Sequence, residues 1–170
     1  MKLKVDQKSI YQILPYGQRF IFLKDVLSVQ SSPARLEASQ NPEIGGGMDA
    51  DHFRSFRVYP GIFILEGCAQ AAVCLYQHAV RKLETDEVPL LAHSRVRFKS
   101  SIKDAVGLIH AVELVKSISG AAIFNGQSRK GQQLVMECEL GLAVRRSGDI
   151  AEPRNRKNSV SDAFLFTKSV

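Results

Sequence analysis

The segment from Ile62 to Leu83 has apolar residues on nearly every face when it is placed on a helix. Such a helix must be wrapped by other structure, because no face of it is suited to water. A helix from Gly61 to about Lys82 would be roughly 33 Å long at 1.5 Å per residue. That is long for a chain of 170 residues. Pro60 suits the first helical turn, where no amide donor is needed. The sequence therefore predicts one long buried helix as the axis of the core.

Glu66 is a lone carboxylate inside this apolar segment, and His52 precedes the Pro60-Gly61 turn that leads into it. A charged group buried among apolar neighbours is costly unless it is paired or neutralised. Burial also raises the pKa of a carboxyl group, which suits proton transfer near neutral pH. The segment therefore offers a base, an acid and a helix N-terminus close together along the chain.

Most of the remaining chain has the composition or the alternation of β-strands. A short helix is expected at residues 9–14, and strands are expected at 20–29, 35–39, 89–99, 107–117, 121–129 and 133–144. Turn residues at 119–120 and 130–131 separate the last three strands, so the last four are predicted to form a meander. The fold class is α+β, with an antiparallel sheet of five or six strands curled around the long helix.

Length and charge divide the chain into two parts. Residues 1–144 are predicted to form one domain, and residues 145–170 a flexible basic extension. The extension holds six Lys/Arg and three Asp/Glu, which is half of the net charge of +6. A nucleic-acid binder would carry a denser basic patch, so none is expected as a partner. The charge fits an acidic protein partner, and it fits an ordinary solvated surface equally well.

Several features favour a cytoplasmic protein without a membrane segment or a metal. The first residues lack the apolar region of a secretory signal, and the apolar run 61–76 is too short to span a bilayer. The three cysteines lie among apolar residues without a CxxC pair, which indicates small buried hydrophobes in a reducing compartment. Asp49, Asp51 and His52 match no metal-ligand spacing, so no metal site is expected.

The stretch from His52 to Gln70 reads HFRSFRVYPGIFILEGCAQ. It is similar, without a gap, to H-F-P-x-x-P-V-M-P-G-V-L-x-x-E-A-x-A-Q, the centre of the FabZ-type 3-hydroxyacyl-[acyl-carrier-protein] dehydratases. Weaker similarities lie at residues 13–26, 96–99 and 137–140, so the resemblance covers about residues 9–144. It implies the hot-dog fold and the dehydration of 3-hydroxyacyl thioesters to trans-2-enoyl thioesters, in fatty acid or specialised lipid biosynthesis.

The resemblance also implies a role for individual residues. His52 would remove a proton from C2 of the acyl chain, and Glu66 would act at the C3 hydroxyl, directly or through water. The Gly61 N–H would bind the thioester carbonyl oxygen, a role that also follows from the free amides at a helix start. The Val58 carbonyl would hold the other imidazole nitrogen. Gln70, one helical turn after Glu66, could form a hydrogen bond with it.

The same resemblance implies partners. The family forms dimers in which each active site takes its histidine from one subunit and its acid from the other. The substrate is carried on the phosphopantetheine of an acidic acyl carrier protein, and no separate cofactor is used. The sequence leaves open whether this chain forms a homodimer or a trimer of dimers. A glutamate rather than an aspartate at position 66 resembles the branch that does not isomerise the double bond.

The chain departs from the family pattern near the site. Arg54 and Arg57 replace two prolines, and one hypothesis is that they contact the phosphopantetheine phosphate or acidic groups of the carrier protein. Tyr59 replaces the usual methionine and is expected to line the acyl tunnel and to shorten or gate it. Tyr16 replaces a histidine. Two alternative functions therefore remain, a hot-dog acyl thioesterase and a non-catalytic paralogue that binds carrier proteins.

Overall fold

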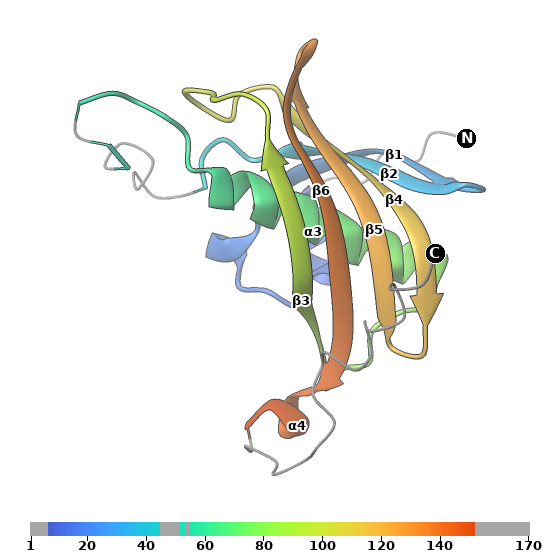
Figure 1. The fold of residues 1–170 in the computed structure, drawn as a ribbon. Helices are drawn as coiled ribbons and strands as arrows, with labels where there is room; N and C mark the ends of the chain where they lie inside the picture. The colour runs from blue at the N-terminus through green and yellow to red at the C-terminus, as the bar shows by residue number, and fades with distance from the viewer. Residues whose placement is uncertain (1–6, 45–51, 54, 152–170) are drawn as a thin grey trace.

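The computed structural model describes residues 7–44, 52–53 and 55–151. The strands lie around one long helix (Figure 1). In chain order the elements are α1 (Gln7–Ile13), the 3-10 helix η1 (Gln18–Phe20), β1 (Leu23–Ser31), β2 (Ala34–Gln40), α3 (Gly61–Ala79), β3 (Glu87–Phe98), β4 (Leu108–Ile118), β5 (Ala121–Lys130), β6 (Gln133–Arg146) and α4 (Ser147–Ala151). The expected strands are all present, although β1 begins later than expected because residues 18–20 form a 3-10 turn.

The six strands form one antiparallel sheet in the order β1-β2-β4-β5-β6-β3. The predicted meander is therefore wrong for β3, which pairs with β6 at the far edge while β2 takes the place beside β4. Two-residue turns join β4 to β5 and β5 to β6, and Ser119 and Gly120 both have the positive φ of tight hairpins. Residues 99–107 between β3 and β4 are too long for such a turn, and this connection allows β3 to cross to the other edge.

Helix α3 lies in the curl of this sheet and contacts all six strands (Figure 1). Most of its residues from Gly67 to Gln77 are fully buried, as its all-round apolar sequence requires. The expectation of α+β class and a hot-dog arrangement is confirmed. The predicted end near Lys82 is wrong, because the helix ends at Ala79. Beyond it the chain turns so that the Arg81 guanidinium reaches the Glu87 carboxylate at 2.7 Å.

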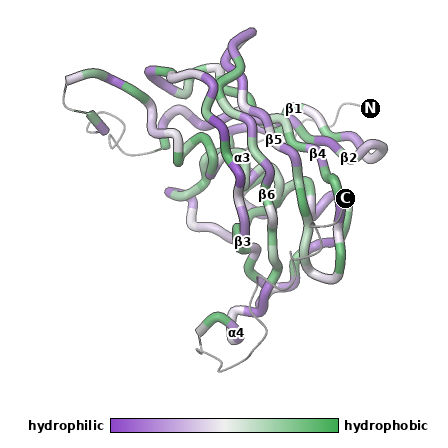
Figure 2. The backbone as a smooth tube through the Cα atoms, in the orientation of Figure 1, coloured by the Kyte–Doolittle hydropathy of each residue, from purple (hydrophilic) through white to green (hydrophobic). Residues whose placement is uncertain are grey.

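The strands place apolar residues toward the helix and polar residues outward, so hydropathy alternates along the chain (Figure 2). Val112, Leu140 and Leu142 are buried, as their alternation predicted. Phe98 was expected on the same pattern, but it is 51% exposed because it lies at the end of edge strand β3. The buried face of the sheet and α3 together form the core.

The last strand ends slightly later than expected. Strand β6 continues two residues beyond 144, and α4 follows directly, while the extension after residue 151 lies outside the described residues. No helix in the described part of the chain is long and apolar enough to cross a membrane. The three cysteines are buried free thiols, as their surroundings predicted. Among the described residues no cluster of metal ligands occurs, and Asp49 and Asp51 lie outside that part.

Candidate active site

The segment that leads into α3 holds the histidine through its main chain. His52 is exposed, and its Nδ1 lies 3.2 Å from the Val58 carbonyl oxygen. The carbonyl can only accept, so Nδ1 carries the proton and donates it. The lone pair of the neutral imidazole is then on Nε2, which is the arrangement a general base needs. Residues 55–60 project beyond the sheet at the N-terminal end of α3 (Figure 1).

The first residue of α3 presents a main-chain donor next to this histidine segment. Pro60 adopts an extended conformation before the helix, and Gly61 is the first helical residue. No described residue accepts a hydrogen bond from the Gly61 N–H. A Cβ at this position would lie 2.7 Å from the Phe98 ring, which makes glycine the residue that fits. The helix start therefore offers an amide that can stabilise negative charge on an oxygen.

Glu66 lies between one and two turns further along the same helix and is partly buried. Desolvation raises the pKa of its carboxyl group, and a hydrogen bond from the Gln70 side chain offsets part of that rise. The Gln70 Nε2 to Glu66 Oε1 distance is 2.8 Å, so the expected bond between these residues is present. A carboxyl group with a raised pKa retains its proton to higher pH and can serve as an acid.

Gln70 is fully buried and does more than contact Glu66. Its Nε2 also donates to the Phe20 carbonyl at 2.7 Å, and its Oε1 accepts from the Phe22 N–H at 2.8 Å. The side chain thus fixes residues 20–22 against α3 and fixes its own rotamer. Because the Gln70 side chain is held in this way, its amide group has little freedom to move away from the Glu66 carboxylate.

Of the remaining predicted residues, the structure describes Tyr59 and Arg57. Tyr59 is 3% exposed, its N–H donates to the Ile102 carbonyl at 2.8 Å, and its ring packs edge-on against Phe63. Arg57 is exposed. The pKa of Asp104 is lowered mainly by a hydrogen bond from Lys130, and the charge of Arg57 adds to this effect. This contribution places Arg57 near Asp104. Arg54 lies outside the described residues.

The structure also brings two further residues to the neighbourhood of the site, Tyr16 and Gln40. Burial raises the pKa of Tyr16 to about 12, and the nearby charge of Glu66 contributes to the rise, so this phenol stays protonated beside the acid. The buried Gln40 side chain donates to the Tyr59 hydroxyl at 3.0 Å. For Tyr16, the departure from the family pattern at this position was a signal in the sequence. No local pattern marked Gln40, because its partners come from distant parts of the chain.

Within a single chain the two predicted catalytic side chains are not joined. Among the described residues, His52 contacts Val58 and Phe53, and Glu66 contacts Gln70. No hydrogen bond links His52 to Glu66.

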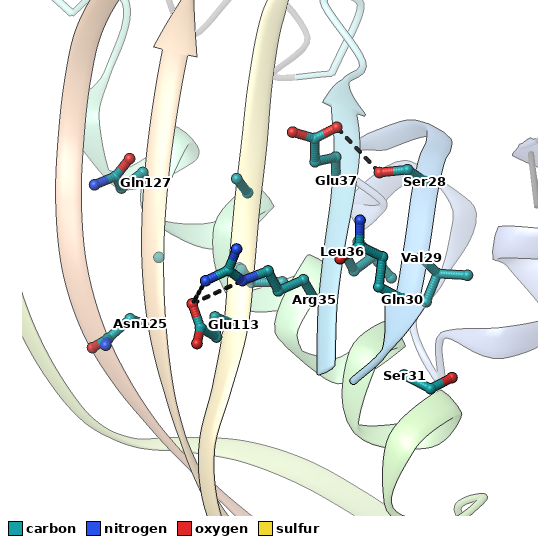
Figure 3. A pocket seen from close by; sticks show the side chains of 13 residues that line it. Ser28, Val29, Gln30, Ser31, Arg35, Leu36, Glu37, Glu113, Asn125 and Gln127 are labelled. Atoms are coloured by element: carbon teal, nitrogen blue, oxygen red, sulfur yellow. Dashed lines mark hydrogen bonds and ion pairs between the residues drawn. The ribbon is translucent and has the colours of Figure 1, made fainter. Parts of the chain in front are cut away.

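A different hollow, of about 870 Å³, lies on the outer face of strands β1, β2, β4 and β5 (Figure 3). Its polar side chains pair with one another: Arg35 contacts Glu113 at 2.8 Å, and Ser28 contacts Glu37 at 3.1 Å. None of the predicted catalytic residues lines it. This hollow is therefore separate from the candidate active site.

Comparison with known proteins identifies the family. A FabA-like domain model matches residues 14–139. A 3-hydroxyacyl-[acyl-carrier-protein] dehydratase FabZ of Tolumonas auensis is 31% identical over 145 residues, covering 84% of this chain and 96% of the relative. The enzyme of the same name from Proteus mirabilis is 29% identical over 140 residues, covering 82% of this chain and 93% of the relative.

The fold has a solved counterpart. A chain of the dehydratase heterocomplex ApeI:P from Xenorhabdus doucetiae superposes with a TM-score of 0.67, at 15% identity, over 83% of this chain and 93% of that chain. At that identity the likeness establishes the hot-dog fold alone. The matched residues 14–139 include His52, Gly61 and Glu66 and most of the sheet. The chain therefore belongs to the FabA-like domain family.

Proposed function

We propose that this protein is a hydro-lyase that converts 3-hydroxyacyl-[acyl-carrier-protein] thioesters into trans-2-enoyl thioesters and water. The relatives named for this reaction align over most of the chain and support the proposal. The observation that carries it is Glu66, a carboxyl group whose pKa is raised by burial, in a helix whose first amide, that of Gly61, donates to none of the described residues. An acid beside an oxyanion site is what elimination of water from a thioester requires.

His52 acts as the base. Its Nε2 takes a proton from C2 of the acyl chain, and the electrons of the broken C2–H bond move into the thioester. The Val58 carbonyl, 3.2 Å from Nδ1, keeps the ring in the tautomer that has its lone pair on Nε2. As the ring becomes positively charged, the same bond becomes charge-assisted and stabilises it.

Gly61 stabilises the charge that develops. Negative charge grows on the thioester oxygen as the C2 proton leaves, and the Gly61 N–H at the start of α3 donates to that oxygen. A main-chain donor held by a buried helix needs no reorganisation during the reaction, which is why it lowers the barrier.

Glu66 acts as the acid. Its carboxyl proton passes to the C3 hydroxyl, directly or through water, the C3–O bond breaks, and a C2=C3 double bond forms as water leaves. Gln70 then donates to the Glu66 carboxylate that remains. The same hydrogen bond lowers the pKa of Glu66 but does not cancel the rise that burial causes. The proton gained by His52 returns to Glu66 through water, so the enzyme is regenerated.

We further propose that two copies of the chain form each site, with His52 from one and Glu66 from the other. Exposed apolar side chains near the helix start and on edge strand β3 support a second copy there; they are Phe53, Phe56, Ile62, Leu91 and Phe98. The dimer, alone or in a trimer of dimers, would accept phosphopantetheine from the carrier protein, with Arg57 near the opening. The buried free thiols support a reducing, cytoplasmic location.

The test follows the mass of the product. A purified 3-hydroxyacyl carrier protein is incubated with the enzyme, and loss of one water is expected. Release of free acid would instead indicate a thioesterase, and an unchanged substrate that still binds would indicate a non-catalytic paralogue. His52→Ala and Glu66→Gln should each reduce the rate by about 10²- to 10⁴-fold. Exposed His78→Ala and Glu84→Gln are the matched controls. Full activity in both site variants would overturn the mechanism.

Mixing the two inactive variants tests the shared site. In a mixed dimer, one of the two sites would receive both wild-type residues, so random mixing should restore about a quarter of wild-type activity. If both residues came from the same chain, no mixture would regain activity. That result would refute the two-copy site while leaving the reaction itself in place.

A further inference from the structure

Four polar side chains form a buried chain of hydrogen bonds beneath the start of α3. Ser128 on β5 and His110 on β4 are 0% exposed, and Gln40 at the end of β2 is 2% exposed. The Ser128 Oγ lies 2.8 Å from the His110 Nδ1, the His110 Nε2 lies 2.6 Å from the Gln40 Oε1, and the Gln40 Nε2 lies 3.0 Å from the Tyr59 hydroxyl. This chain runs from the middle of the sheet to the segment that carries the main-chain groups of the site.

Chemistry fixes the donors and acceptors along this chain from Ser128 to the Gln40 amide. The Gln40 amide group also lies 3.4 Å from the Phe63 carbonyl oxygen. That oxygen can only accept, so the amide nitrogen must face it and the amide oxygen must face His110. Burial lowers the pKa of His110 to about 3, so the ring is neutral, and its one N–H must be on Nε2. Ser128 then donates to Nδ1. The imidazole therefore holds the Gln40 amide in one of its two possible orientations.

The Gln40 amide, once oriented, holds the residue between the two main-chain groups. Tyr59 lies between Val58, whose carbonyl contacts His52, and the Pro60-Gly61 step that begins α3. The Tyr59 main chain is held by the Ile102 carbonyl, and its hydroxyl is held by Gln40. The second amide contact, to the Phe63 carbonyl, holds the first turn of the same helix.

The helix makes room for this arrangement at one position. A Cβ on Gly67 would lie 2.1 Å from the Gln40 Oε1 and 2.6 Å from the His110 Nε2, distances that no side chain allows. The missing methyl group leaves the volume that the Gln40–His110 pair occupies. The glycine and the buried pair are therefore one structural feature.

We propose that Gln40, oriented by His110, is a positioning residue that sets the segment from Val58 to Gly61 relative to α3. Its contacts hold the Val58 carbonyl that orients His52 and the Gly61 amide that meets the substrate oxygen. Gln40 and His110 touch no reacting atom, and their effect on the reaction passes through Tyr59 and Phe63. The kinetic part of this proposal rests on the proposed dehydration. The structural part does not.

The kinetic test removes the donor that Gln40 supplies and the donor that orients it. Gln40→Met and His110→Leu are expected to lower kcat by about 10- to 100-fold, the cost of slightly misplaced catalytic groups, with KM changed by less than about threefold. His110→Gln places an amide nitrogen where Nε2 lies and should recover most of kcat. Gln127→Met, the same exchange at an exposed position on β5, should match the wild type. Equal kcat in Gln40→Met and Gln127→Met would overturn the proposal.

The structural test reads the site without turnover. The Gly61 amide resonance in a ¹H–¹⁵N spectrum should move in Gln40→Met and His110→Leu and stay in place in Gln127→Met. An unmoved resonance would refute the positioning role whatever the kinetics show. A moved resonance in a protein that does not dehydrate would sink the proposed function and leave the positioning role standing.

Discussion

The buried His110 makes the stability of the fold depend on pH in a way that can be calculated. Its side chain is 0% exposed, and desolvation lowers its pKa from 6.5 to about 3. In the unfolded chain the imidazole takes up a proton once the pH falls below about 6.5, whereas in the folded protein it stays neutral until about pH 3. The stabilising contribution is therefore fully present above pH 6.5 and is lost as the pH falls.

The magnitude follows from how far the pH falls below the unfolded-state pKa of 6.5. When the pH is lowered from about 8 to about 5, it ends about 1.5 units below the pKa of His110 in the unfolded chain. Protonation then stabilises the unfolded state by about 1.36 kcal/mol for each of these units, which is about 2 kcal/mol. His110→Gln has no proton to take up and keeps the donor to Gln40. The free energy of unfolding of the wild type should thus fall by about 2 kcal/mol more than that of His110→Gln over this range.

Urea unfolding at the two pH values measures this difference directly. His78→Gln, which removes an exposed imidazole, is the matched control. If the wild type and His110→Gln lose the same free energy of unfolding within about 0.5 kcal/mol, His110 is not buried as a neutral ring, and the reasoning is refuted.

Two further predictions concern other parts of the core. Gln70→Met removes the hydrogen bond that lowers the pKa of Glu66, so that pKa should rise further in ¹³C-carboxyl titrations; an unchanged or lower value would contradict the assigned cause. At Gly126 a Cβ would lie 2.6 Å from the Cys68 Sγ and 2.7 Å from the Cys138 Sγ. Gly126→Ala should therefore lower the free energy of unfolding by about 1–3 kcal/mol in urea. When Cys68→Ala and Cys138→Ala are also present, Gly126→Ala should lower the free energy of unfolding by less. An equal loss with and without the two cysteines would exclude their sulfur atoms as its origin.

The candidate site could be predicted largely from sequence because its residues lie in one continuous stretch that carries the resemblance. The resemblance implied the contact of Val58 with His52, and the spacing of one helical turn predicted the contact of Glu66 with Gln70. The bond of each pair is present in the structure. The roles of these residues in catalysis, and the contacts of Arg54 and Arg57 with a carrier protein, remain predictions.

The sequence by itself determined the buried helix and the strand segments, since hydrophobic periodicity is a property of neighbouring residues. Only the tertiary structure decided that β3 pairs with β6 and that β2 lies beside β4, because strand alternation is the same whichever neighbour a strand pairs with. It also brought Gln40 and His110, seventy residues apart, together under Gly67. Their meeting depends on sheet order and on the close approach of α3, which no local spacing encodes.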